Sequence, residues 1–117
     1  AATISTCTAL GSETMKIYLN CCYASKVQIF NEFYAHCEKT GCRYDTVTSL
    51  MLKNGWINPM HTSVPGTDGQ LSYGGFCFPK DTNALLSHMQ ACGSAHRVLE
   101  AVIAERNEMR GNDSARN

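Results

Sequence analysis

Apolar residues recur three and four positions apart along a stretch without Gly or Pro, from Ser12 to Thr40. They are Ile17, Cys21, Ala24, Phe30, Phe33, Tyr34 and Cys37, and the stripe drifts between Ala24 and Phe30. Ser12 is a common N-cap residue, and Lys39 places a cation near the C-terminal end. The pattern predicts a helix about 40 Å long. Because a compact domain of this size is on the order of 35 Å across, either the helix is kinked or a second subunit covers it.

Three shorter helices are predicted after this stretch. We expect Asp45 to cap the first of them, Asp81 the second and Ser94 the third. Asn54-Gly55 and Gly93 carry the stop signals of the first two. The third contains Val98, Leu99, Val102 and Ile103.

Between the first and second short helices, residues 54–79 contain three prolines and five glycines. A structureless connection of that length is uncommon in a small domain, so we expect an ordered or functional loop. No strand-like alternation longer than a few residues occurs, and the region before Ser12 is too short to build a sheet. We therefore predict an all-α fold of one long helix plus three or four shorter helices. Residues 12–110 form the domain, 1–11 an N-terminal extended segment and 111–117 a disordered tail.

Composition and charge exclude several classes of protein. Ten Lys and Arg balance ten Asp and Glu, without the basic excess of a nucleic-acid binder or a polybasic membrane-surface protein. No apolar run approaches the roughly 18 to 20 residues of a spanning helix. The seven cysteines are an odd number in a chain able to bury its own core, which argues against a disulfide framework. We expect a cytoplasmic protein with no nucleic-acid or membrane partner.

The most informative segment for chemistry is Tyr73-Gly74-Gly75-Phe76-Cys77-Phe78-Pro79-Lys80-Asp81. Its two glycines allow the backbone to approach a ligand closely, and Cys77 stands at the start of a predicted helix. The positive end of that helix and the cation of Lys80 favour a thiolate, the reactive form of cysteine. A buried, unreactive cysteine is the alternative, and this segment alone does not decide between the two.

Together with upstream residues, this segment resembles the central domain of the UDP-glucose/GDP-mannose dehydrogenase family. The matching residues run in order through most of the chain: ExxKxxxN at 13–20, Lys26, Asn31-Glu32, 37–41 and GGxCFPKD at 74–81. The combination is specific, whereas the glycine pair alone is a weak signal and not a dinucleotide-binding fingerprint. The resemblance implies an all-α fold like the C-terminal domain of 6-phosphogluconate dehydrogenase.

The resemblance also implies an activity and the residues that perform it. Members of the family oxidise the C6 alcohol of a nucleotide sugar such as UDP-glucose to a uronic acid in two NAD-dependent steps. Cys77 would be the nucleophile that holds the substrate carbon as a thiohemiacetal and then as a thioester. Lys16 and Asn20 would stabilise developing oxyanion charge, and Asp81 would assist water or proton handling.

The spacing of these residues agrees with the implied roles. Lys16 and Asn20 are four positions apart and share one helix face, so a cation and an amide donor can point at one oxygen. A solvated polar pair is the alternative for them, and a plain N-cap is the alternative for Asp81.

The resemblance implies that the remaining predicted site residues would bind substrate. They are Tyr73, Gly74, Gly75 and Lys80. The two glycines would let the backbone touch the sugar, and an ordinary turn that requires positive φ is the alternative for them.

Two features depart from the family pattern. Many members carry Asp-x-Arg-Ile after the second helix, with an arginine that reaches the nucleotide across the dimer, whereas this chain has Asn54-Gly55-Trp56-Ile57. The following loop, 58–72, is also several residues longer than usual, so the identity of the sugar stays open. His61 could replace the lost cation, although a lone loop histidine more often has no such role.

Family enzymes flank the helical domain with two Rossmann-type domains, one for NAD and one for the nucleotide, and we expect neither to be encoded in the 117 residues. NAD is therefore expected to bind outside this chain, and the chain alone is expected to be inactive. We also expect a homodimer through the long helix. A stand-alone helical dimerisation or binding module without activity is the alternative, and an independent cysteine hydrolase lacks a base linked to Cys77.

The other polar residues give weaker signals. His88, Cys92 and His96 lie four positions apart, but Gly93 interrupts the helix between them, so we predict no metal site. The charged residues of the last helix are predicted to form its solvated side: Glu100, Glu105, Arg106, Glu108 and Arg110.

Overall fold

The computed structural model describes residues 2–111, with side chains from residue 10 onward. Within residues 2–111 there are four α-helices and no strand: α1 (Ala2–Thr40), α2 (Tyr44–Leu52), α3 (Cys77–Cys92) and α4 (Arg97–Arg110). The predicted all-α fold of one long helix and three shorter ones is confirmed. No helix in this range has the length and apolar character needed to cross a membrane.

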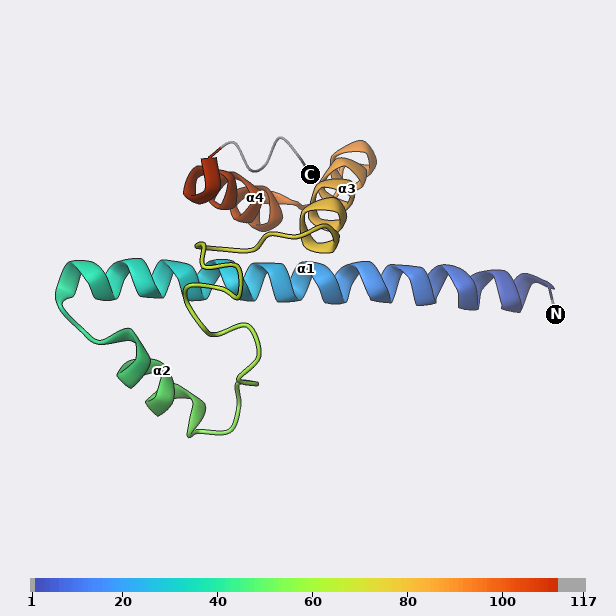
Figure 1. Cartoon of the computed structure of the whole chain (residues 1–117). Helices are drawn as coiled ribbons and strands as arrows, with labels where there is room; N and C mark the ends of the chain where they lie inside the picture. The colour runs from blue at the N-terminus through green and yellow to red at the C-terminus, as the bar shows by residue number, and fades with distance from the viewer. Residues whose placement is uncertain (1, 112–117) are drawn as a thin grey trace.

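Helix α1 is the axis on which the other elements are arranged (Figure 1). Helices α3 and α4 lie on one side of it and α2 on the other, and the long loop crosses α1 between the two sides. At about 1.5 Å per residue the 39 residues of α1 give about 58 Å, close to the longest extent of the molecule, 57 Å. The helix is continuous and shows no sharp kink in Figure 1. It therefore extends beyond the elements that pack on it.

The start of α1 corrects one prediction. The extended segment predicted for residues 1–11 was wrong over residues 2–11, which are helical. This stretch contains no proline, and extending an existing helix fixes one residue for each hydrogen bond gained, so propagation costs little. Residue 1 and residues 112–117 of the predicted tail lie outside the described residues.

The three short helices begin earlier or later than predicted. Asp45 lies in the first turn of α2, Asp81 lies four residues inside α3, and Ser94 precedes α4 by three residues, so none of them is the N-cap. The residues at the cap positions make no side-chain cap bond: Arg43, Phe76 and His96. Helix α3 starts early because proline is tolerated in a first turn, where Pro79 stands.

The predicted stop of α3 at Gly93 is confirmed. Gly93 has a φ of 71°, in the left-handed region, and its N–H donates to the Gln90 and Met89 carbonyls. The Ser94 N–H also donates to Met89 O at 3.0 Å, which completes a Schellman end.

Two apolar clusters hold the other elements on α1. In the first, Cys21 packs with Leu99 and Ile103 of α4, and four partly buried residues surround them: Ile17, Leu85, Leu86 and Met89. In the second, Phe30 and Cys37 pack with Tyr44 of α2, with four more around them: Tyr34, Met51, Ile57 and Val64. Full burial of an apolar side chain stabilises a fold by about 1.5 to 3 kcal/mol. Both clusters therefore depend on one helix, α1.

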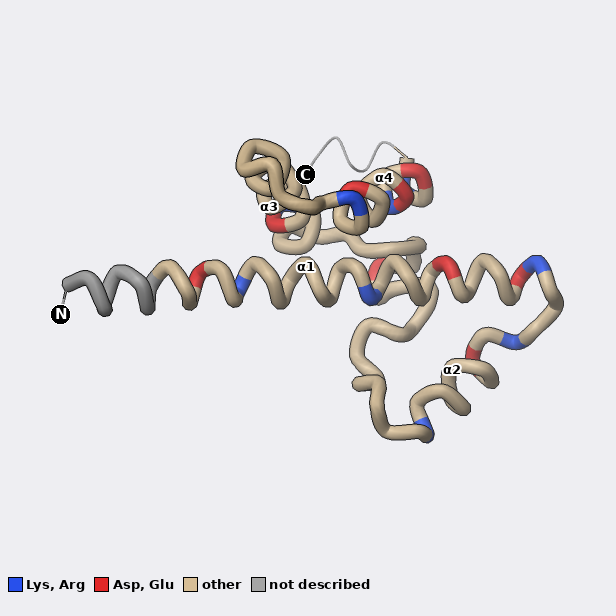
Figure 2. Tube along the Cα trace, turned by 180° about the vertical axis from the view of Figure 1, so that it is seen from behind, with Lys and Arg blue, Asp and Glu red and all other residues tan. Residues whose placement is uncertain are grey.

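Charged residues of both signs are interspersed over the molecule and do not form a patch of one sign in the view of Figure 2. On α4 the acidic and basic positions lie close together. Among the described residues, the basic and acidic side chains are thus mixed in space.

We predict that the free energy of unfolding falls as pH rises from about 9 to 12. Burial, with the nearby Asp81 carboxylate, raises the pKa of Cys21 from 9.0 to about 11. Burial, with Asp45, raises the pKa of Tyr44 from 10.0 to about 12. The folded state holds these two protons to higher pH than the unfolded state does, so their stabilising contribution is complete below pH 9 and is lost above it.

Urea unfolding followed by circular dichroism at several pH values measures this slope. Other groups titrate in the same range, so the matched control is the Cys21→Ala, Tyr44→Phe double variant, whose slope should be shallower. Equal slopes for the variant and the natural chain would contradict the prediction.

Candidate functional site

The polar contact between α1 and α3 joins two of the four predicted catalytic residues. Asn20 Nδ2 donates to Asp81 Oδ2 at 2.7 Å, although the two residues are 61 positions apart in the sequence. Lys80 Nζ lies 3.7 Å from the other Asp81 oxygen, and the Asp81 side chain is 15% exposed. Both carboxylate oxygens therefore face a donor, and the group lies at the edge of the solvent.

Lys16 and Cys77 extend this contact on each helix. Lys16 is exposed on α1 four residues before Asn20, and Cys77 is exposed at the first position of α3, four residues before Asp81. Residues at this spacing share one face of a helix. The four predicted catalytic residues thus form two pairs, one on each helix, that the Asn20–Asp81 bond connects.

The surroundings of the Cys77 thiol favour nucleophilic chemistry. The N–H groups in the first turn of a helix have no partner within the helix, and they give this end a partial positive charge. Lys80 is exposed, and its ammonium lies 5.1 Å from the centre of the Phe76 ring. A thiolate at Cys77 therefore stands at a helix N-terminus, and the cation of Lys80 lies three residues further along the same helix.

Gly74 and Gly75 are needed for different reasons. Gly75 is exposed and has a φ of 76°, which L side chains rarely adopt. At Gly74 the constraint is space, since a Cβ would lie 2.5 Å from Arg110 Nη1 and 3.0 Å from Asp68 Oδ2. Only Gly75 faces the solvent freely, and Gly74 is packed against α4.

Tyr73, predicted to bind substrate, is buried at 4% exposure. Its ring centre lies 5.3 Å from the Arg106 guanidinium carbon and 6.3 Å from the Phe78 ring centre. Its carbonyl accepts a hydrogen bond from Arg106 Nε at 2.9 Å. Burial raises the pKa of the Tyr73 hydroxyl. Tyr73 therefore stabilises the loop through its contacts with Arg106 and Phe78.

Sequence reasoning missed the residues that hold this loop. Arg106 and Arg110 were predicted to be solvated, but Arg106 is 2% exposed and the side chain of Arg110 is 3% exposed. Gln28 and Asn31 of α1 are also buried and contact the loop at Ser72. The drift of the apolar stripe between Ala24 and Phe30 was the signal for Gln28, and Asn31 follows directly after Phe30.

His61 packs as an aromatic residue. Its ring centre lies 5.1 Å from that of Tyr23 and 5.7 Å from that of Phe78, and its φ is 67°. The same loop is tied to α1 by the Lys26 ammonium, which donates to the Asn58 carbonyl. The contact of His61 with Phe78 holds the long loop beside α3. Phe78 is the second residue of this helix and directly follows Cys77.

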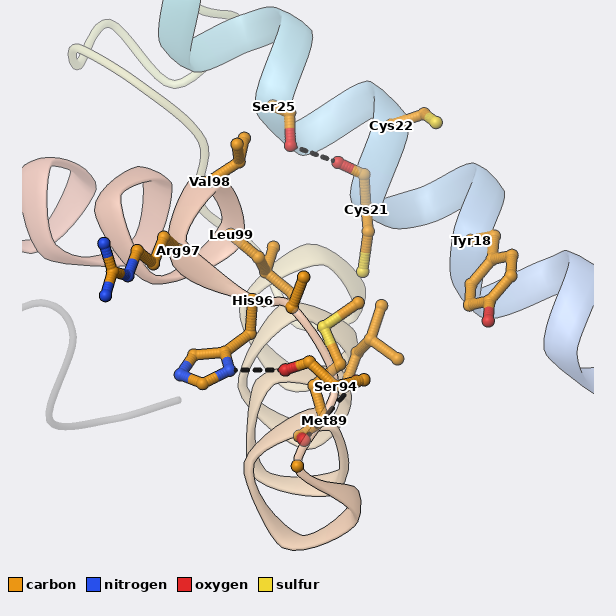
Figure 3. A pocket seen from close by; sticks show the side chains of 13 residues that line it. Tyr18, Cys21, Cys22, Ser25, Met89, Ser94, His96, Arg97, Val98 and Leu99 are labelled. Atoms are coloured by element: carbon orange, nitrogen blue, oxygen red, sulfur yellow. Dashed lines mark hydrogen bonds between the residues drawn. The ribbon is translucent and has the colours of Figure 1, made fainter.

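Two other places on the described part of the molecule contain none of the predicted site residues. Cys92 Sγ lies 3.5 Å from His88 Nε2, but within residues 2–111 no three His, Cys, Asp or Glu side chains are grouped as a metal site requires. The second place is an apolar groove of about 800 Å³ between α1, α3 and α4. Cys21 points toward Leu99 and Met89 in this groove, and Cys22 points away from them (Figure 3).

Comparison with known proteins finds a family model and several relatives that match this chain. Residues 11–108 match the family model described as UDP-glucose/GDP-mannose dehydrogenase family, central domain. The chain is 31% identical over 97 residues to UDP-glucose 6-dehydrogenase TuaD of Bacillus subtilis, covering 83% of this chain and 20% of that protein. It is 35% identical over 95 residues to UDP-glucose 6-dehydrogenase of Rhizobium meliloti, covering 80% of this chain and 20% of that protein.

The chain spans about one fifth of the length of these curated relatives. No solved structure gives a significant match to it. The match nevertheless extends over most of the chain, from before Lys16 to beyond Asp81. The chain therefore belongs to the UDP-glucose/GDP-mannose dehydrogenase family and corresponds to its central domain.

Proposed function

We propose that this chain supplies the catalytic thiol of a nucleotide-sugar 6-dehydrogenase, which oxidises a substrate such as UDP-glucose to a uronic acid. The observation that carries the proposal is the Asn20–Asp81 hydrogen bond of 2.7 Å. It brings together the two halves of the family motif, ExxKxxxN and GGxCFPKD, which are more than fifty residues apart in the sequence. A helical module without catalysis would not need this set of four side chains, which the bond connects as two pairs.

The proposed chemistry begins when the Cys77 thiolate adds to the C6 aldehyde carbon of the partly oxidised sugar. A C–S bond forms, and the carbonyl electron pair moves to the oxygen as negative charge. Lys16 and Asn20 donate to that oxygen, because a cation and an amide on one helix face can stabilise the same developing charge. The product of this step is a thiohemiacetal on Cys77.

Oxidation of the thiohemiacetal gives a thioester, which water must hydrolyse. Asp81 accepts a proton from the attacking water, the C–S bond breaks, and the Cys77 thiolate leaves as the carboxylate forms. The Asn20 bond orients the Asp81 carboxylate for this role. Stabilisation of negative charge is thus assigned to Lys16 and Asn20 on α1. Nucleophilic attack and proton transfer are assigned to Cys77 and Asp81 on α3.

Each of the two oxidations releases a hydride and needs an acceptor, and NAD would supply that chemistry when bound. Residues 2–111 do not fit a dinucleotide, since the recognised site lies at a strand–turn–helix and there is no strand among them. We therefore propose that NAD binds to other parts of the enzyme, and that this chain alone does not turn over.

We also propose that a second copy of the chain packs along α1. Large apolar side chains are exposed along this helix and at the adjoining start of α4: Leu10, Met15, Tyr18, Leu19, Ile29, Phe33 and Val98. Four of them, Leu10, Met15, Tyr18 and Leu19, line one groove together, and an exposed apolar patch marks an interaction site. The long helix also protrudes beyond the elements that pack on it, as expected of a helix shared between two subunits.

The cysteines support a proposal about the location of the protein in the cell. Six of them are free thiols in the described part of the chain: Cys21, Cys22, Cys37, Cys42, Cys77 and Cys92. Free thiols persist in a reducing compartment, so we propose a cytoplasmic location. Of these six, Cys77 alone begins a helix.

We predict that iodoacetamide at neutral pH alkylates Cys77 about tenfold faster than Cys22, because the positive end of α3 stabilises negative charge on the attacking sulfur. Cys22 is the matched control, since it is also exposed but lies in the middle of α1. Peptide mapping by mass spectrometry measures both rates on one sample. Equal rates would argue against a preformed nucleophile.

In the complete dehydrogenase, we predict that Asp81→Asn lowers kcat for UDP-glucose and NAD by about 10²-fold to 10⁴-fold. The asparagine oxygen can still accept the Asn20 hydrogen bond, so the fold should be kept while the base is lost. Cys77→Ser should lower turnover further, and Cys92→Ser is the control at an exposed thiol outside the site. Turnover by Cys77→Ser equal to that of the natural enzyme would exclude the thiol mechanism.

We predict that the isolated chain, of 12.8 kDa, is a dimer in solution and that Tyr18→Glu makes it a monomer. The substitution places a charge on the exposed apolar face of α1, where a dimer would bury it. Light scattering coupled to size exclusion measures the mass, with Thr46→Glu on α2 as the control. A natural chain that remains at the monomer mass at high concentration would refute this part of the proposal.

A further inference from the structure

The loop that leads to Cys77 is fixed by two arginines of α4. Three successive backbone carbonyls accept hydrogen bonds from them. Arg110 Nε donates to Leu71 O at 2.8 Å and Arg110 Nη2 to Ser72 O at 3.1 Å. Arg106 Nε donates to Tyr73 O at 2.9 Å. The guanidinium group suits this task because its planar fork presents several donors in fixed directions.

The charges of both arginines are compensated within the protein. Arg110 Nη2 lies 2.8 Å from Asp68 Oδ2, and the Arg106 guanidinium lies over the Tyr73 ring. Burial alone would raise the pKa of Asp68, but the Gln70 N–H and the Arg110 guanidinium lower it. A buried charge without such partners is strongly unfavourable. The side chains of Arg106 and Arg110 are therefore buried between α4 and the loop.

Helix α1 holds the same loop from the opposite side. The Ser72 N–H donates to Asn31 Oδ1 at 2.8 Å, and the Ser72 hydroxyl donates to Gln28 Oε1. Gln28 Nε2 in turn donates to Glu105 Oε1 of α4 at 2.7 Å. Ser72 thus has polar contacts to α1 and α4, five residues before Cys77.

The backbone of Ser72 is strained. Its φ is 60°, a conformation that a non-glycine residue keeps only where the surroundings determine it. The next constraint follows at Gly74, where a Cβ would lie 2.5 Å from Arg110 Nη1. Strain and close approach occur together within a few residues of the thiol, as is typical of functional loops.

We propose that Arg106 and Arg110 are positioning residues, which fix residues 71–74 so that Gly75 and Cys77 have the geometry required for the thiol chemistry. This inference rests on the proposed function of Cys77. Neither arginine touches the substrate. They act through the three loop carbonyls, and a displacement of about 1 Å at a reacting group can lower a rate by about 10²-fold.

The test uses Arg110→Lys, which keeps a cation for Asp68 but cannot donate to two carbonyls in the fixed directions of a guanidinium. Arg97→Lys is the matched control, since Arg97 is exposed at the start of the same helix. In the isolated chain, we expect amide hydrogen exchange at residues 71–76 to rise at least tenfold, with exchange at residues 83–92 of α3 unchanged. In the complete dehydrogenase, we expect kcat to fall about 10²-fold with a smaller change in KM.

A double-mutant cycle separates positioning from general loss of stability. Gly74→Ala should lower kcat in the natural enzyme, because the new Cβ displaces the guanidinium. It should have a smaller effect beside Arg110→Ala, where no guanidinium remains. If Arg110→Ala does not fold, the same cycle is made with Arg110→Lys.

Three results would overturn the inference: unchanged exchange at residues 71–76, an equal rise of exchange in all helices, or faster loop exchange with unchanged kcat. Additive effects in the cycle would also contradict it. The exchange measurement needs no activity, so it gives an answer even if Cys77→Ser shows that the proposed function is wrong.

Discussion

Asn20 donates to Asp81 across the contact between α1 and α3, next to Cys21, whose side chain packs against Leu99 in the apolar core. The candidate site and the apolar core therefore meet at neighbouring residues of α1, Asn20 and Cys21. The packing of Cys21 against Leu99 holds α4 on α1, and the hydrogen bond of 2.7 Å joins α1 to α3. A change in either alters the relation of Lys16 to Cys77, which have no direct contact of their own among those described.

The loop before Cys77 has to be held in place mainly by polar contacts. Residues 66–76 contribute little apolar surface to the two clusters, so polar side chains from α1 and α4 hold them in place. Such a polar network is favourable only when each buried group has a partner, and within the described residues no buried side-chain polar atom lacks one. The network holds the loop against α1 and α4.

Much of the fold could be predicted from the sequence, because helical spacing of apolar residues is a local property. The long helix, the three short ones and the stop at Gly93 follow from that spacing and from local capping rules. Helix starts were less predictable. Asp81 looked like an N-cap, but its partner is Asn20, 61 residues away, and no local rule includes that residue.

The candidate site was predictable only in part. Lys16, Asn20, Cys77 and Asp81 could be named from the motif, and the structure brings the two motif halves together. Arg106 and Arg110 looked like solvated charges on an amphipathic helix. Their burial depends on carbonyls of a loop that precedes them by more than thirty residues, so it could not be inferred from α4 alone.

The central claim is that Cys77 bonds covalently to the substrate carbon at the Asn20–Asp81 contact. The most direct measurement is peptide mapping by mass spectrometry of the complete Asp81→Asn enzyme after incubation with UDP-glucose and NAD. The account predicts a sugar-nucleotide adduct on Cys77, because the thioester forms but its hydrolysis is slowed. An adduct on another cysteine, or turnover without any adduct, would contradict it.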